Sequence, residues 1–348
     1  MSDTSPLNEI TDLAEENDQQ DNQTPVVEQP QPEQEAEPLP DDQDTISLDT
    51  PPLLTMVREE EEEEETYIDN GPSAETRILT RKLSETAPIE TPSLLAAQVS
   101  HLGAIRERNE DSSLILNAQM AGHFSQIPFG LYMVADGMGG HMNGHEASNL
   151  AIRVVTRQII NRIYLPMMQN TSGPPQAPVQ EVLVQAVEAA NDAIFSPDPD
   201  LDGGTTLTIA LMIGRRLHVA HVGDSRAYLL HGDQFDQITD DHSLIRRLQD
   251  VGQLPADDPA FLNMRHVLLR AVGQGDELEV DTYTLRLPAT GRLLLCSDGL
   301  SGLLTDSEMK VILQKSIPPT ETADLLCQAA LQAGGHDNIT AVIVDFNL

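Results

Sequence analysis

The stretch Gly130–Gly140 reads GLYMVADGMGG, and it combines an apolar run, an aspartate and, after the aspartate, three glycines, a combination that recurs in part elsewhere in the chain. Leu131–Ala135 is an apolar run of the length that is typical of a buried strand. The run ends at Asp136, and because Gly137 follows, the backbone can turn tightly and approach a ligand closely. A carboxylate beside an accessible backbone carbonyl is a good ligand for a hard cation. The stretch therefore predicts a metal-binding aspartate, although a polar residue that closes a strand is the plainer alternative.

The same combination of an apolar run and an aspartate recurs further along the chain. Asp224 and Asp298 each follow an apolar run and are next to a glycine, and Asp337 precedes the last apolar run. Glu110 and Asp111 form a further acidic pair. Four strands that each carry an aspartate at one end favour a carboxylate cluster around metal ions over four unrelated turn residues.

Such a cluster suits Mn²⁺ or Mg²⁺, which prefer oxygen ligands, whereas no Cys/His set has the spacing of a zinc site. Two divalent ions about 3.5 to 4 Å apart lower the pKa of a water between them, giving a hydroxide that can attack phosphorus. Arg106 is expected to bind the phosphate oxygens through its planar fork of donors. Because an acidic site repels a phosphate dianion, we expect the reaction to require metal.

Charge is distributed unevenly along the 348 residues. The net charge is -36, and residues 1–95 hold 26 Asp+Glu against 4 Lys+Arg, including seven consecutive glutamates at Glu59–Glu65. So acidic a protein is not expected to bind nucleic acid or an anionic membrane surface. Low hydrophobicity combined with high charge predicts a disordered acidic tail and linker over residues 1–95, and a folded domain over residues 96–348.

Targeting and redox features indicate a cytoplasmic protein. Met1–Gln20 has no basic region followed by an apolar run, and no stretch approaches the roughly 18 apolar residues of a membrane span. Cys296 and Cys327 both lie in apolar segments, so we expect core side chains rather than a disulfide.

Strand and helix patterns alternate through the folded part. The run 203–238 predicts a meander of short strands joined by glycine turns, hence a largely antiparallel sheet. Residues 239–272 are long for a hairpin connection and are expected to cap one edge of the site. Two packed sheets with helices outside, an α+β fold, best fit the whole pattern. Helical spacing of apolar residues predicts amphipathic helices at 147–165, 179–195, 306–314 and 321–333.

Eight blocks occur in a specific order: RERNED (106–111), ADGMGGH (135–141), GGTTL (203–207), HVGDSRAYLL (221–230), DHSL (241–244), LLRAVG (268–273), CSDGL (296–300) and HDNIT (336–340). In this order the chain resembles the metal-dependent protein phosphatases of the protein phosphatase 2C type, in their bacterial form. The resemblance covers about residues 96–348. It implies an αββα sandwich, a monomer, and substrates that are phosphoproteins made by Ser/Thr kinases.

The resemblance also implies a role for each matching acidic residue. Asp136 would bridge two core metal ions, Mn²⁺ or Mg²⁺. Asp298 and Asp337 would complete the shell of one ion. Glu110 and the carbonyl of Gly137 would serve the other.

The same resemblance bears on five further positions. Asp111 would order a metal-bound water, Arg106 would bind the phosphate, and Asp224 would help to hold a third, weaker ion. Met138 stands where animal members carry a histidine that is a proposed general acid. His141 is the expected substitute, with a metal-bound water as the alternative donor and a structural loop histidine as the plainer interpretation.

Other polar residues of these blocks have simpler interpretations. His221 is expected to be a core histidine, and His242 to cap the helix that follows, a role that Ser243 also suits. Thr205 and Thr206 are interpreted as strand residues behind the site.

The sequence as a whole predicts a Mn²⁺- or Mg²⁺-dependent protein serine/threonine phosphatase that forms no phosphoenzyme. A regulatory pseudophosphatase that binds phosphoproteins or a kinase is the alternative from another class. A hydrolase of small phosphate esters is the alternative among enzymes. Every matching metal-ligand position is filled, which favours an active enzyme.

Overall fold

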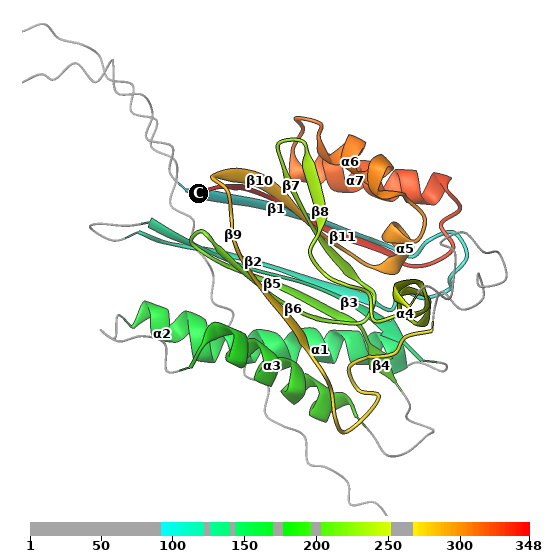
Figure 1. The fold of residues 1–348 in the computed structure, drawn as a ribbon, viewed down its shortest axis with the longest axis horizontal. Helices are drawn as coiled ribbons and strands as arrows, with labels where there is room; N and C mark the ends of the chain where they lie inside the picture. Colours follow the sequence, from blue (N-terminus) through cyan, green and yellow to red (C-terminus); the bar gives the residue numbers. More distant parts are fainter. Residues whose placement is uncertain (1–91, 122–125, 140–142, 170–176, 196–202, 252–266) are drawn as a thin grey trace, which may run out of the picture. The chain divides into compact units, whose positions relative to one another are not determined.

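The computed structural model describes residues 92–121, 126–139, 143–169, 177–195, 203–251 and 267–348. Most of the predicted tail, up to residue 91, and His141 lie outside these residues, so the expectations for them stay predictions. Within the described part, two antiparallel sheets are stacked between two layers of helices (Figure 1).

The first sheet has the strand order β1-β11-β10-β7-β8. Every neighbouring pair in it is antiparallel. The first and last strands of the fold, β1 and β11, lie side by side, so the sheet joins the two ends of the domain. Its strands are β1 (Ser93–His101), β7 (Arg226–His231), β8 (Gln234–Gln237), β10 (Thr290–Cys296) and β11 (Ile339–Asn347).

The second sheet has the order β2-β3-β5-β6-β9, and the short strand β4 also pairs with β3. All of these pairs are antiparallel too. The predicted meander therefore contributes β4, β5 and β6 to this sheet, and β7 and β8 to the other. The strands are β2 (Asp111–Ala121), β3 (Gln126–Met138), β4 (Gly204–Thr205), β5 (Leu207–Ile213), β6 (Arg216–Val222) and β9 (Asp281–Arg286).

Helices cover the outer face of each sheet (Figure 1). The second sheet is covered by α1 (Asn143–Ile159) and α3 (Val179–Ile194), with a π-helical turn η1 (Ile160–Tyr164) and a short α2 (Leu165–Met168) after α1. The first sheet is covered by α5 (Asp298–Ser301), α6 (Asp306–Leu313) and α7 (Pro319–Gln332). The αββα sandwich that the sequence predicts is thus confirmed.

Three apolar cores hold the layers together, one under each helical layer and one between the sheets. Strand β3 contributes to two of them, because Leu131 and Met133 face α1 and α3 whereas Tyr132 and Val134 face the other sheet. Alternate side chains of a strand point to opposite faces, so a strand buried on both faces has a continuous apolar sequence. Each such side chain contributes about 1.5–3 kcal/mol of stabilisation. This burial makes β3 a rigid support for Asp136 at its end.

The long connection over residues 239–272 is joined to the fold at both of its described parts. Two isolated bridges, Ser243 with Leu268 and Thr205 with Val272, hold its returning segment. Helix α4 (Leu244–Asp250) is capped by Ser243, whose Oγ accepts the N–H of Arg246 at 3.3 Å, so His242 is not the cap. None of the helices in the described residues is long and apolar enough to cross a membrane.

Candidate active site

Strands of both sheets end at one common edge, and the predicted acidic residues lie there. Asp111 starts β2 and is paired with Asp136 of β3 across the ladder. Asp298 follows β10 as the first residue of α5, and Asp337 lies just before β11. Asp224 lies in the turn between β6 and β7. The fold therefore gathers five aspartates from strands that are far apart in sequence.

Electrostatic interactions show how close these carboxylates are. Burial raises the pKa of Asp136 well above its ordinary value, and the negative charges of Asp111, Asp298, Asp224 and Asp337 raise it further. Burial, followed by the charge of Asp298, raises the pKa of Asp224 to about 8. Burial is also the main reason that the pKa of Asp111 is raised to about 7. Buried carboxylates that repel one another are costly unless a cation neutralises them.

The backbone of Asp136 is fixed by two threonines. Thr206 Oγ1 accepts the N–H of Asp136 at 2.9 Å, and the N–H of Thr206 donates to the Asp136 carbonyl at 2.8 Å. Thr205 Oγ1 donates to the same carbonyl at 2.9 Å. The sequence interpretation of both threonines as ordinary strand residues missed this role, which only the block GGTTL could have suggested.

Gly137 lies where three segments meet. Its N–H donates to the Glu110 carbonyl at 3.1 Å, and a Cβ at this position would overlap the carbonyl oxygens of Gly144 and Glu110. Any side chain would therefore push the start of α1 away from β3. Burial raises the pKa of Glu110, and the positive charge of Arg106 partly offsets this shift.

Asn338 and Ser297, which lie next to strands of the first sheet, form hydrogen bonds to the acidic residues Glu110 and Asp111. Asn338 Oδ1 accepts the N–H of Glu110 at 2.8 Å, and its amide nitrogen donates to the carbonyls of Leu102 and Arg108. Ser297 Oγ donates to Asp111 Oδ2 at 2.8 Å. These supports were also missed from the sequence, because their partners are 186 to 236 residues away along the chain.

The other oxygen of Asp111, Oδ1, is buried without a hydrogen-bond partner among the described residues. A buried acceptor in that state costs about 1–3 kcal/mol, so Oδ1 is a candidate ligand atom at this edge. Water or a metal ion are ligands of suitable chemistry for an anionic oxygen.

Arg106 lies at the rim of the cluster. Its Nη2 donates to Asp337 Oδ2 at 2.7 Å, and about half of its side chain is exposed. The hydrogen bond with Asp337 raises the pKa of the guanidinium. The other oxygen of Asp337, Oδ1, accepts the N–H of Asn338 at 2.8 Å.

Within the described residues, no three Asp, Glu, His or Cys side chains are arranged so that they could enclose one ion as they stand. Repulsion between the carboxylates and the pairing of Asp337 with Arg106 both favour the more open arrangement. The donor set nevertheless fits Mn²⁺ or Mg²⁺, because it consists of buried, mutually repelling carboxylates, the unpartnered Oδ1 of Asp111 and backbone oxygen.

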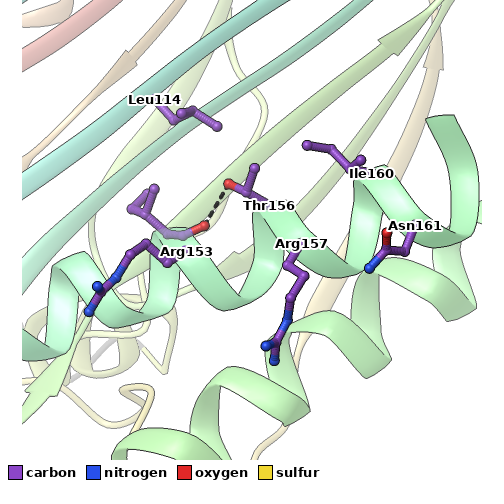
Figure 2. A pocket seen from close by; sticks show the side chains of 7 residues that line it. Leu114, Arg153, Thr156, Arg157, Ile160 and Asn161 are labelled. Atoms are coloured by element: carbon purple, nitrogen blue, oxygen red, sulfur yellow. Dashed lines mark hydrogen bonds between the residues drawn. The ribbon is translucent and has the colours of Figure 1, made fainter. Parts of the chain in front are cut away.

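A separate groove lies beside α1, away from the acidic edge (Figure 2). Leu114 of β2, the second half of α1 and the start of η1 line it, with Arg153 and Arg157 one helical turn apart. None of its lining residues is acidic, so it is not a candidate for the metal ions.

Comparison with known proteins gives a consistent result. Residues 96–247 match the family model described as Protein phosphatase 2C. The serine/threonine phosphatase stp of Listeria innocua is 36% identical over 247 residues, covering 71% of this chain and 93% of that protein. The serine/threonine protein phosphatase PstP of Mycobacterium tuberculosis is 37% identical over 252 residues, covering 71% of this chain and 44% of that protein. A crystal structure of M. tuberculosis PstP/Ppp superimposes with a TM-score of 0.60 at 34% identity, covering 73% of this chain and 99% of that one.

The αββα sandwich, its acidic edge and these relatives define one class of protein: the chain belongs to the protein phosphatase 2C family, in its bacterial form. It is a protein serine/threonine phosphatase. The resemblance noted from the eight sequence blocks is thus confirmed.

Proposed function

We propose that this chain hydrolyses phosphoserine and phosphothreonine in proteins with the help of two divalent ions, Mn²⁺ or Mg²⁺, at the acidic edge. Asp136 would contact both ions. Asp298 and Asp337 would complete the shell of one, and Glu110 and the carbonyl of Gly137 the shell of the other. The observation that carries this proposal is the gathering of buried, mutually repelling carboxylates around Asp136.

The ions, when bound, would lower the pKa of a water molecule between them and so supply a hydroxide nucleophile. Asp111 would orient that water, because its Oδ1 is available while Ser297 fixes its Oδ2. The hydrogen bonds from Thr205 and Thr206 would fix the backbone of Asp136 and so keep its carboxylate at the acidic edge. A rigid arrangement of this kind reduces the reorganisation that the reaction requires.

Arg106 would bind the phosphate oxygens. Coordination of an ion by Asp337 Oδ2 would compete with its bond to Arg106, and weakening that bond would free the guanidinium for the substrate. A guanidinium binds a phosphate through parallel donors, which a lysine cannot do.

Two finer assignments complete the proposal. Asp224 would help to hold a third, weaker ion, supported by its burial and by its interaction with Asp298. His141, which lies outside the described residues, is the proposed general acid for the departing serine or threonine oxygen.

A solved structure of a relative supports Mn²⁺ as the ion at the proposed site. The catalytic domain of PstP, described in complex with 2 manganese ions, superimposes with a TM-score of 0.59 at 34% identity, covering 74% of this chain and all of that one. We therefore propose Mn²⁺ first and Mg²⁺ as the alternative ion.

We also propose the domain boundaries, the oligomeric state, the compartment and the substrates. Residues 96–348 would form the phosphatase domain and residues 1–95 an acidic tail outside it. The protein would act as a monomer in the cytoplasm on products of Ser/Thr kinases. The names of the relatives support phosphoprotein substrates.

The test is hydrolysis of p-nitrophenyl phosphate and of a phosphothreonine peptide with Mn²⁺, with EDTA and after Asp136→Asn. We expect activity that requires Mn²⁺ and a loss in the variant that exceeds the roughly 10–100-fold effect of an outer-shell change. In EDTA, Asp136→Asn should unfold at the same temperature as the parent or a higher one, because it removes a repelled buried charge. Full activity of the variant would contradict the proposal.

A comparison of phosphopeptides with small phosphorylated metabolites would separate the protein phosphatase from a hydrolase of small phosphate esters. A pseudophosphatase would bind the peptide without hydrolysing it. Neither alternative is favoured by a feature of the structure.

A further inference from the structure

His242 lies in the block DHSL, directly before Ser243, the cap of α4. The role of helix cap that the sequence analysis considered for His242 is therefore filled by its neighbour. The His242 side chain is buried, with 7% of its surface exposed. It makes hydrogen bonds to three segments that are far apart in sequence. The first of these is the turn that carries Asp224.

Both polar groups of the Gly223 backbone are satisfied by His242. The N–H of Gly223 donates to His242 Nδ1 at 3.1 Å, and the Gly223 carbonyl accepts the backbone N–H of His242 at 2.7 Å. Gly223 has a φ of +109°, and a Cβ there would collide with Thr206. The turn before Asp224 therefore depends on an unusual backbone conformation, and His242 holds it from both sides.

The orientation of the imidazole is fixed from its other end. The Gly223 N–H can only donate, so Nδ1 accepts it and the proton of the neutral ring is assigned to Nε2. That nitrogen is 3.2 Å from Asp281 Oδ2, which can accept the proton, and 3.3 Å from Arg270 Nη1. Arg270 donates to the other oxygen of Asp281 at 2.9 Å, and the Tyr283 hydroxyl is 3.5 Å from Oδ2. Asp281 is thus held in place by its own partners and holds the ring in turn.

The third contact joins the segment that returns after α4. The carbonyl of His242 accepts the N–H of Leu269 at 2.7 Å, beside the bridge between Ser243 and Leu268. One residue therefore connects the Asp224 turn, the start of α4, the returning segment and, through Asp281, strand β9.

We propose that His242 is a positioning residue for Asp224: its Nδ1 and backbone N–H fix the Gly223 turn, and so determine where Asp224 presents its carboxylate. The inference rests on the proposed function, because it assigns a supporting residue to the proposed third-ion ligand. In this role His242 would act through Gly223 and would itself contact neither an ion nor the substrate.

The experiment compares two amide variants in the full chain. In His242→Asn the side-chain oxygen can take the place of Nδ1 and accept the Gly223 N–H. In His242→Gln the longer side chain reaches toward Asp281 instead and leaves that N–H without an acceptor. The matched control is His218→Asn, because His218 lies on β6 and is similarly buried at 8% exposure, and because its ring bonds, within the described residues, to Thr284 of β9.

Two measurements are made on each variant: hydrogen exchange of the Gly223 amide by NMR, and Mn²⁺ binding by calorimetry. We expect His242→Gln to expose the Gly223 amide to faster exchange and to weaken the weaker class of Mn²⁺ site on the order of tenfold, with the tighter sites unchanged. His242→Asn should restore both properties to within about threefold of the parent, and the control should alter neither.

Equal Mn²⁺ affinities and equal Gly223 protection in His242→Gln and the parent would overturn the positioning role. So would equal losses in the Asn and Gln variants, or no weaker class of site in the parent. A chain that shows the expected amide and Mn²⁺ responses but hydrolyses no phosphopeptide would support the positioning role and overturn the proposed function. The two failures are therefore distinguishable.

Discussion

Individual residues at the acidic edge depend on partners that neutralise or position them. The Thr206 hydroxyl accepts the N–H of Asp136 and also lies 2.7 Å from the hydroxyl of Ser225. The environment is fully enclosed, since Thr206 and Ser225 are buried. In a buried environment, a polar group that lacks its hydrogen bond destabilises the protein by more than a satisfied hydrogen bond stabilises it.

Thr206→Val preserves the shape of the side chain but leaves the Asp136 N–H without its acceptor. We expect the variant to be about 1–3 kcal/mol less stable and to have lower phosphatase activity, whereas Thr206→Ser keeps the hydroxyl and most of both properties. Urea unfolding and Mn²⁺-dependent hydrolysis check this. A loss in Thr206→Ser together with none in Thr206→Val would show that the methyl group, rather than the hydroxyl, is what matters.

His221 predicts a dependence of stability on pH. Burial, with the nearby imidazole of His242, lowers the pKa of His221 from 6.5 to about 3, and Asp281 and the Asp240 carbonyl only partly oppose the shift. Below pH 6.5 the unfolded chain therefore binds a proton that the folded protein does not, so folding stability falls as the pH falls. At pH 5 the loss is roughly 2 kcal/mol, and above pH 6.5 it is absent.

We expect urea unfolding between pH 7.5 and pH 5 to show a steeper loss of stability in the parent than in His221→Asn. Comparing the pH slopes removes the contribution of all other titrating groups, which the two proteins share. Parallel slopes would mean that His221 becomes protonated in the folded protein.

At the scale of elements, Arg292 attaches the helical layer to the first sheet. It lies on β10, pairs with Asp345 of β11, and donates to the carbonyls of Leu313 and Ile317 and to the hydroxyl of Thr322. Its side chain is 9% exposed, so these groups lose water when the layer packs. The network joins two strands to both α6 and α7.

Arg292→Met should destabilise the protein by about 3 kcal/mol, because it leaves buried acceptors and a partly buried carboxylate without their donor. Arg216→Met is the control, since Arg216 is an exposed arginine on β6. We expect the control to change stability by less than about 0.5 kcal/mol in the same urea titration. A similar effect of both substitutions would contradict the role given to the Arg292 network.

At the scale of the whole molecule, the two sheets bring the ends of strands from opposite parts of the chain to one edge. Strand β1 pairs with β11 in one sheet and β2 with β3 in the other, so the acidic residues next to β2, β3, β10 and β11 become neighbours. All of these residues lie within the family-like region, after residue 95.

Removal of residues 1–91 should leave Mn²⁺-dependent hydrolysis of p-nitrophenyl phosphate within a few-fold of the full chain, since none of the proposed site residues is removed. Steady-state kinetics of both proteins at equal Mn²⁺ check this. A complete loss of activity in a truncated protein that still shows cooperative unfolding would assign the tail a part in the reaction.

The sequence by itself determined the layers and predicted the acidic residues proposed for the site. Apolar runs long enough to be buried on both faces, helical periodicity, and aspartates at run ends are local patterns, and the eight blocks identified the family. Because these features depend on residues close together along the chain, they can be recognised without a structure.

Only the tertiary structure decided how the site is held. Thr206 with Asp136, Ser297 with Asp111, and His242 with Gly223 are contacts across about 20 to nearly 190 residues. No local pattern distinguishes a hydroxyl or imidazole that supports such a partner from one that caps a helix or fills a core. The ion pair of Asp337 with Arg106 is likewise a contact between distant residues, since it forms only where two loops far apart in sequence meet.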